Sequence, residues 1–181
     1  MSQKFSVIAL VALIAVILYF VVRTAPNFTR PALGSEYLVT VEIEGLHERV
    51  QASRARVKLV NVWATWCLPC LEEFPYLMRL KRELSPEDFD LIFVSADVEE
   101  DQEKVLAFLS SQGVDFETYL MGGSDEEFIR GLHPEWSGAL PATAIYDSQA
   151  EIRDFWIGDR SFEYFKDRVG EILNHEVGTN F

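Results

Sequence analysis

The two cysteines of the chain, Cys67 and Cys70, are separated by two residues and are its best candidates for chemistry. Cysteines at this spacing either form a reversible disulfide or supply half of a zinc site. A zinc site needs two further ligands, and His47, His133 and His175 lie too far apart in the sequence to offer the usual histidine pair. The pattern therefore favours disulfide exchange, and we expect no metal.

The cysteine pair stands at a predicted junction between a strand and a helix. Residues 57–63 form a short, mostly apolar run, typical of a strand buried on both faces, and apolar side chains then recur with helical spacing. At the start of that helix, unpaired backbone N–H groups and the positive end of the helix dipole favour a thiolate over a thiol. We therefore expect Cys67 to be the nucleophile, with Cys70 one turn further on and within disulfide reach.

A carboxylate stands close to this pair. Glu73 follows Cys70 by three residues, so both lie on one helix face, one turn apart. If buried, a carboxyl group there has a raised pKa and can exchange protons with Cys70. The alternative is a solvated helix residue like Glu72. A permanent structural disulfide is a second alternative, but a loop of two residues constrains the unfolded chain little.

The rest of the chain alternates strand and helix patterns, which predicts an α/β sandwich around a mixed sheet. Residues 37–44 alternate apolar and polar side chains, as a half-buried strand does, and we expect Gly45 to turn the chain back toward Val50 as a hairpin. The predicted order of elements is β-β-β-α-β-α-β-α-β-β-α. The other predicted strands lie at 91–95, 142–146 and 152–157. The other predicted helices are one at 100–111, a short one after the capping box at 124–127, and one at 161–175.

An uncharged apolar stretch opens the chain. Residues 5–22 carry no charged side chain, and as a helix they span about 27 Å, close to the hydrocarbon thickness of a bilayer. A cleaved signal peptide usually has a shorter apolar region, and Arg23 and Pro26 are unfavourable around the small-residue site at Ala25. The sequence predicts a membrane anchor at 1–23, a linker at 24–35 and a folded domain at 36–181.

The charge is strongly negative, with 16 Lys and Arg residues against 29 Asp and Glu residues. Three of the basic residues precede Glu36, so the remainder has 13 basic and 29 acidic residues and a net charge of −16. Such a domain repels phosphate backbones, which excludes nucleic acid as a partner. A macromolecular partner is expected to be neutral or basic.

Two segments of the sequence resemble a known family. Residues 60–75, with the Trp66-Cys67-Leu68-Pro69-Cys70 motif, resemble the active-site segment of thioredoxin-fold proteins, and residues 138–143 resemble their cis-proline loop. Within that fold the chain is similar to the membrane-anchored TlpA/ResA-like thiol–disulfide oxidoreductases. The marks of that branch are Asn61, Glu73 and the pair Phe74-Pro75.

The resemblance implies a thioredoxin-like domain with a mixed central sheet, flanked by helices and extended at the N-terminus by a strand or hairpin and a transmembrane helix. It implies a cis bond before Pro141 and no cofactor beyond the Cys67–Cys70 disulfide. In having a proline directly before the second cysteine, the motif resembles that of the reducing members of the fold. The implied catalytic residues are Cys67, Cys70 and Glu73, and the implied partner-binding residues are Trp66, Leu68, Pro69, Leu140 and Pro141.

The resemblance also implies partners and a location. The partners are protein disulfides, such as those of an apocytochrome c or a copper-delivery protein, and a membrane thiol carrier would supply electrons. With residues 5–22 in a bacterial inner membrane, the domain would face the periplasm or the outside.

Three other functions remain open. A peroxidase of the same superfold would carry Thr-x-x-Cys, whereas Ala64 stands at that threonine position. A copper-binding assembly factor would want three residues between its cysteines and a histidine ligand, for which His133 is the candidate. A non-catalytic interaction domain would have no need of Glu73 beside Cys70.

Overall fold

The computed structural model describes residues 13–14 and 37–178, and its helices and strands from Leu38 onward belong to one compact unit. The predicted anchor at 5–22 lies outside the described residues, apart from Leu13 and Ile14. Within the described ranges, every helix is too short or too polar to cross a bilayer.

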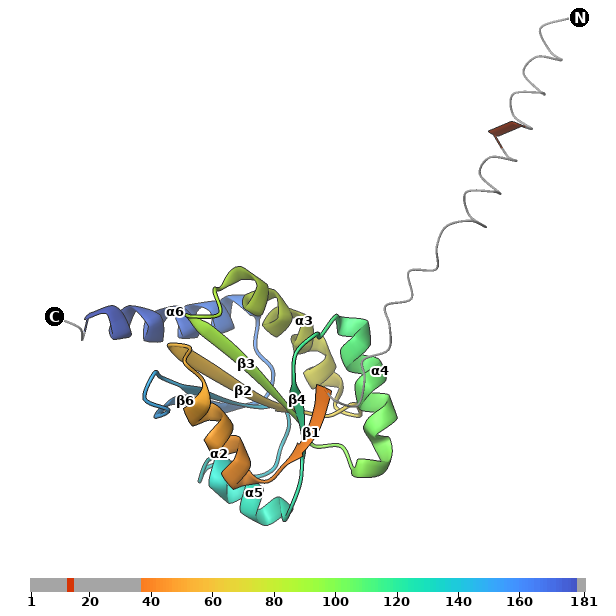
Figure 1. The fold of residues 1–181 in the computed structure, drawn as a ribbon, viewed down its shortest axis with the longest axis horizontal. Helices are drawn as coiled ribbons and strands as arrows, with labels where there is room; N and C mark the ends of the chain where they lie inside the picture. The colour runs from red at the N-terminus through yellow and green to blue at the C-terminus, as the bar shows by residue number, and fades with distance from the viewer. Residues whose placement is uncertain (1–12, 15–36, 179–181) are drawn as a thin grey trace, which may run out of the picture. The chain divides into compact units, whose positions relative to one another are not determined.

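A six-stranded mixed sheet forms the centre of the fold (Figure 1). Its strand order is β1-β4-β3-β2-β5-β6, in which the first four strands run parallel and β5 and β6 run antiparallel to their neighbours. The strands are β1 (Leu38–Val41), β2 (Val57–Trp63), β3 (Phe89–Ser95), β4 (Thr118–Met121), β5 (Ala142–Tyr146) and β6 (Ile152–Ile157).

Helices cover both faces of this sheet, as Figure 1 shows. One core cluster contains buried residues of α3, α4 and α6, and the other contains buried residues of α2 and α5. The helices are α2 (Ile43–Ala52), α3 (Leu68–Glu83), α4 (Gln102–Gln112), α5 (Asp125–Leu132) and α6 (Phe162–Gly178), with a 3₁₀ turn, η2, at Glu99–Asp101. The α/β sandwich around a mixed sheet is as expected.

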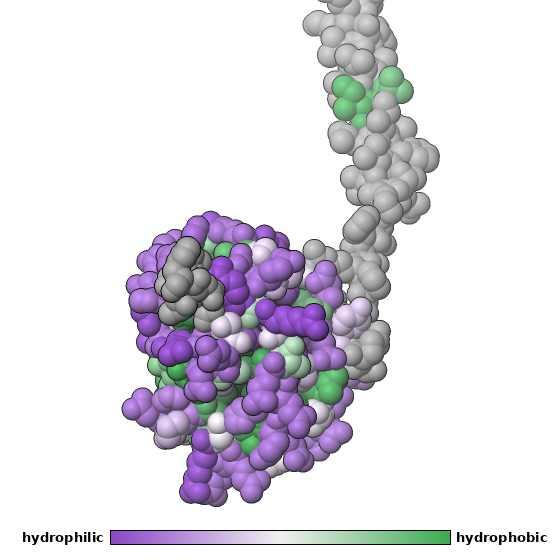
Figure 2. Space-filling model, turned by 60° about the vertical axis from the view of Figure 1, so that its left-hand side comes forward, coloured by the Kyte–Doolittle hydropathy of each residue, from purple (hydrophilic) through white to green (hydrophobic). Residues whose placement is uncertain are grey.

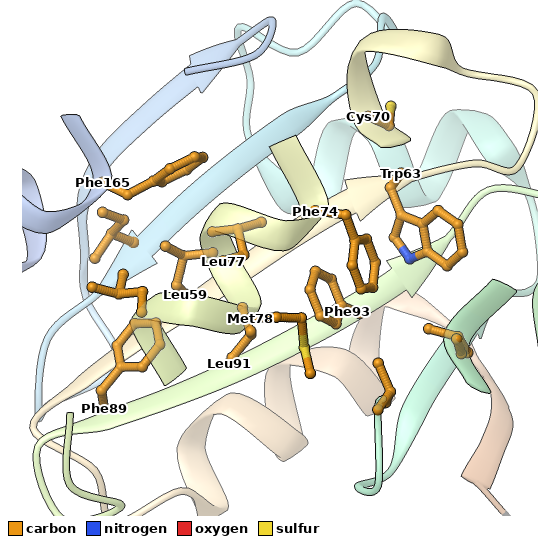
Figure 3. Packing of buried hydrophobic residues seen from close by; sticks show 14 of the residues in the cluster. Leu59, Trp63, Cys70, Phe74, Leu77, Met78, Phe89, Leu91, Phe93 and Phe165 are labelled. Atoms are coloured by element: carbon orange, nitrogen blue, oxygen red, sulfur yellow. The ribbon is translucent and has the colours of Figure 1, made fainter. Parts of the chain in front are cut away.

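The core between the sheet and α3 combines aromatic and aliphatic side chains (Figure 3). All seven residues of β2 are buried, as the apolar run predicted. Phe74 of α3 stacks on Phe93 of β3 with ring centroids 4.0 Å apart, and its edge meets Trp63 at 5.1 Å. Each such buried side chain stabilises the fold by roughly 1.5–3 kcal/mol. The same cluster includes Cys67 and Cys70, so the cysteines rest directly on the core.

The hairpin predicted after Gly45 is wrong, because residues 43–52 form helix α2. Ile43, Leu46 and Val50 are its buried residues, and their spacing of three and four places them on one helix face. Gly45 serves close packing rather than a turn, since a Cβ there would lie 2.9 Å from a methyl group of Val41. The observed order therefore has a helix where the sequence predicted a second strand.

The sheet register gathers four connecting segments at one edge. Trp63 pairs with Ser95, so the segments after β2 and β3 leave the sheet together. Ala142 pairs with both Val62 and Ile157, so the loop before β5 and the segment after β6 reach the same edge. This edge, at the carboxyl ends of the parallel strands, is where α/β sheets place their ligands.

Candidate active site

The cysteine pair lies at this edge as a disulfide. Cys67 is the N-cap residue of α3, and Cys70 lies in its first turn, with Cα atoms 5.3 Å apart. Pro69 stands at a helix start, where its missing N–H costs no hydrogen bond. Cys67 is 6% exposed and Cys70 is 1% exposed, so the first sulfur is the more accessible of the two. The junction of strand and helix is therefore where the sequence predicted it.

Glu73 is buried one helical turn beyond Cys70 and is bound by two segments of the chain. Its Oε1 accepts a hydrogen bond of 2.8 Å from the side-chain amide of Asn61 on β2. Its Oε2 accepts one of 3.1 Å from the backbone N–H of Arg160, in the segment between β6 and α6. The same Asn61 amide donates to Thr143 Oγ1 on β5 at 3.1 Å. Both carboxyl oxygens are thus held inside the fold.

Burial raises the pKa of Glu73 from its ordinary 4.5 to about 7. Loss of hydration disfavours the charged form, and the nearby carboxylate of Asp159 adds to this. The hydrogen bonds from Asn61 and from the Arg160 amide act in the opposite direction, since they stabilise the carboxylate. At neutral pH the group therefore populates both protonation states, as a proton acceptor and donor requires.

A second buried carboxylate, which the sequence did not single out, holds the segment before the disulfide. Asp97, just after β3, accepts 2.9 Å and 2.5 Å hydrogen bonds from the backbone N–H and hydroxyl of Thr65. It also accepts the hydroxyl of Ser95 at 2.7 Å. The Ala96 N–H donates to the Trp63 carbonyl at 2.7 Å. The segment that leads to Cys67 is therefore fastened to the segment after β3.

The signal for Asp97 lies in the topology. An aspartate two residues after a parallel strand lies at the edge where the neighbouring strand ends, and the cysteine motif follows that neighbour. The sequence could not have identified the Arg160 backbone N–H as a partner of Glu73, because every residue except proline carries such a group.

The predicted partner-binding residues divide into two groups. Trp66 is 68% exposed and Leu68 is 65% exposed, while Pro69 is half-buried between the two cysteines. Leu140 is half-buried and Pro141 is buried, and the peptide bond between them is cis. The Pro141 carbonyl accepts a 2.8 Å hydrogen bond from Gly158, which ties this loop to the segment that holds Glu73.

His133, the candidate copper ligand, lies in the connection between α5 and β5. Its ring stacks on Phe155 with centroids 4.1 Å apart, and its Nδ1 accepts the Glu135 N–H at 3.3 Å. The ring thus has packing and hydrogen-bonding partners of its own.

The fold and the disulfide at its edge define a class of protein, the thioredoxin-fold thiol–disulfide oxidoreductases. The chain belongs to the Redoxin family, whose model matches residues 23–161. Within the thioredoxin superfamily it is a TlpA/ResA-like thiol–disulfide oxidoreductase, as the resemblance implied.

The names of two similar proteins agree with this assignment. The thiol-disulfide oxidoreductase ResA of Bacillus thuringiensis (strain Al Hakam) is 24% identical over 150 residues, covering 83% of this chain and 77% of that protein. The thioredoxin-like protein YneN of Bacillus subtilis (strain 168) is 25% identical over 136 residues, covering 75% of this chain and 71% of that protein.

Solved structures agree on the fold. A thiol:disulfide interchange protein of the thioredoxin family from Chlorobium tepidum TLS superposes with a TM-score of 0.58 at 20% identity, covering 75% of this chain and 90% of that one. StoA from Bacillus subtilis superposes with a TM-score of 0.52 at 21% identity, covering 64% of this chain and 84% of that one.

Proposed function

We propose that this oxidoreductase is a reductase of protein disulfides that works outside the cytoplasm. Cys67 is the attacking sulfur, Cys70 is the resolving sulfur, and Glu73 exchanges the proton of Cys70. One observation carries the proposal: a buried carboxyl group with a pKa of about 7 lies one helical turn below the less exposed cysteine.

The reaction has two exchange steps. The Cys67 thiolate of the reduced protein attacks one sulfur of the partner's disulfide, which forms a mixed disulfide and releases the partner's other sulfur as a thiolate. The Cys70 thiol then loses its proton to the Glu73 carboxylate and attacks Cys67. This closes the Cys67–Cys70 bond and releases the partner's second thiolate. Two electrons have passed from the dithiol to the partner.

The partner's chain needs a surface that holds it during both steps. Trp66 and Leu68 offer exposed apolar area beside the disulfide, with Pro69 between the sulfurs. The backbone at Leu140 and Pro141 would hold an extended partner segment as an added strand. Apocytochrome c and copper-delivery proteins carry disulfides of the required kind, and a membrane thiol carrier would return the electrons.

The location rests on the sequence. The uncharged residues 5–22 suit a single membrane span, with the domain of residues 36–181 on the outer side of a bacterial inner membrane. Carbonate extraction of membranes, followed by intact-mass measurement, tests this. Retention in the membrane with the N-terminus intact is expected, and a soluble species that begins near Pro26 would contradict the anchor.

Insulin reduction with dithiothreitol as electron source tests the activity. The full chain should precipitate insulin faster than dithiothreitol alone, and Cys67→Ser should abolish the acceleration. Without dithiothreitol, the pre-reduced Cys70→Ser variant should instead accumulate the mixed disulfide, because the first step needs only Cys67. If Cys67→Ser matches the wild-type rate, the chain acts by binding alone and the proposal fails.

A further inference from the structure

Three strongly exposed apolar side chains lie on the segment that carries the disulfide and on the segment bound to it. Trp66 and Leu68 flank Cys67 in the sequence, and Val98, at 61% exposure, comes directly after Asp97. Because Asp97 is hydrogen-bonded to Thr65, the backbone that carries Val98 runs beside the backbone that carries Trp66. On the face in Figure 2, hydrophilic side chains predominate and apolar ones form small patches. Three large apolar side chains exposed on neighbouring segments of a folded domain mark a contact site.

Acidic side chains border this apolar surface. Glu99 and Glu100 follow Val98 directly and are exposed. Glu72 lies one helical turn after Leu68 and on the same face of α3, and it is also exposed. Asp159 is exposed and directly precedes Arg160, whose backbone N–H binds Glu73, so a fourth exposed carboxylate lies beside the segment that holds Glu73. We call these four residues the acidic rim.

The cations near the acidic rim form no ion pair with it among the described residues. Lys104 is paired with Asp101 at 2.6 Å. The Arg160 guanidinium donates to the carbonyls of Gly158 and Asp159, which leaves its positive charge in place beside Asp159. Within residues 37–178, no salt bridge involves a carboxylate of the acidic rim. The acidic rim therefore keeps an excess of negative charge, with four carboxylates against the one cation of Arg160.

We propose that the substrate segment is a basic one, in which Lys or Arg side chains lie close to an accessible disulfide. The apolar side chains contact the segment next to its cysteine, and the acidic rim binds the flanking cations. This inference rests on the proposed reductase function and names the class of substrate that the reductase accepts. The complementary charges raise the rate of encounter more than the affinity of the complex.

Two synthetic peptides test the charge preference. Each is closed by one disulfide, and they differ only in having two lysines or two glutamates beside the cysteines. Their rates of reduction by the reduced full chain are measured by stopped flow and divided by their rates with tris(hydroxypropyl)phosphine, an uncharged reductant, so that intrinsic differences between the two disulfides cancel. At low salt we expect the lysine peptide to react about 10-fold faster, and at 0.5 M NaCl the ratio should fall close to one, because the Debye length is then only a few ångströms.

Two double variants with the same change of charge test whether the acidic rim causes the preference for the lysine peptide. Glu99→Gln with Glu100→Gln should lower the low-salt ratio about threefold. The control is Glu87→Gln with Glu151→Gln, which removes the same charge from exposed positions beside the opposite edge of the sheet, before β3 and between β5 and β6. The control should keep the wild-type ratio.

The outcomes separate the inference from the function on which it rests. Equal normalised rates for both peptides would overturn the basic-substrate inference and leave the reductase intact. An equal fall in the ratio for both double variants would overturn it too, because net charge would then replace the acidic rim as the cause. Failure to reduce either peptide would overturn the reductase function and the inference together.

Discussion

Asn61 binds two residues that belong to different parts of the active site. Its single amide group donates to Glu73 on α3 and to Thr143, two residues after the cis-proline. The carboxyl group that we assign to proton exchange and the loop that we assign to the partner are thus connected through one side chain on β2. An aspartate at this position would add a second buried carboxylate 2.8 Å from the first, at a high electrostatic cost.

Asn61→Ala should raise the pKa of Glu73 above its present value of about 7, because the hydrogen bond from Asn61 stabilises the carboxylate. The proton-accepting form would then need a higher pH. The rate at which the mixed disulfide is resolved, measured from pH 6 to 9, should therefore show a midpoint shifted upward. Thr143→Val removes the other acceptor and leaves Glu73 untouched, so a smaller shift is expected. An unchanged midpoint in Asn61→Ala would show that Glu73 does not set the pH dependence.

Glu73→Gln should change how stability depends on pH. The folded-state pKa of about 7 lies above the ordinary 4.5, so the folded protein holds this proton more tightly than the unfolded chain. The stability from this group is therefore fully present below about pH 4.5 and is lost as the pH rises through about 7, a change of about 3 kcal/mol.

Denaturation by guanidinium at pH 5 and pH 8 measures this dependence. The wild type should lose stability relative to Glu73→Gln between the two values. A constant difference between the two proteins would mean that Glu73 has an ordinary pKa. Resolution of the mixed disulfide should be slow in the variant at every pH.

Asp97→Ala should destabilise the protein by about 2 kcal/mol, because it leaves the Thr65 amide and the Ser95 hydroxyl without their acceptor. Urea denaturation of the oxidised full chain provides the value. Ser95→Ala, which removes one donor and keeps the carboxylate with Thr65, is the control and should cost less. Equal losses would show that Asp97 does little for the segment before Cys67.

Alkylation should distinguish the two cysteines. In the reduced full chain, a limiting amount of iodoacetamide should modify Cys67 first, because Cys70 is almost wholly buried beneath it. Peptide mass spectrometry reads the site, and the denatured chain, in which both sulfurs are accessible, is the control. Modification of Cys70 ahead of Cys67 would reverse the assigned roles.

Local patterns were sufficient for the parts of this protein that depend on burial and spacing. The apolar run of β2, the cysteines at the start of α3 and the capping box at Ser124, whose hydroxyl accepts the Glu127 N–H, all follow from neighbouring residues. Glu73 was found because helical periodicity relates it to Cys70.

The features that the sequence did not predict, helix α2 and the roles of Asp97 and the Arg160 backbone N–H, depend on long-range contacts. The alternation in residues 37–44 ends where Ile43 begins a helix, and that helix is favoured by packing against α5, where a Cβ on Gly131 would meet an Ile43 side-chain carbon at 2.5 Å. Asp97 and the Arg160 amide act on residues 32 and 87 positions away, respectively, so only the sheet register brings them to the site.

The position of Trp63 gives this protein an optical signal of its own oxidation state. Its indole shares one buried cluster with both cysteines and packs against Phe74, in a region that excludes water. A disulfide close to an excited indole quenches its emission, whereas a dithiol quenches it less. Reduction should therefore brighten the tryptophan fluorescence of the native protein, and Trp63→Phe should remove most of that change. A fluorimeter would then follow both half-reactions without a label.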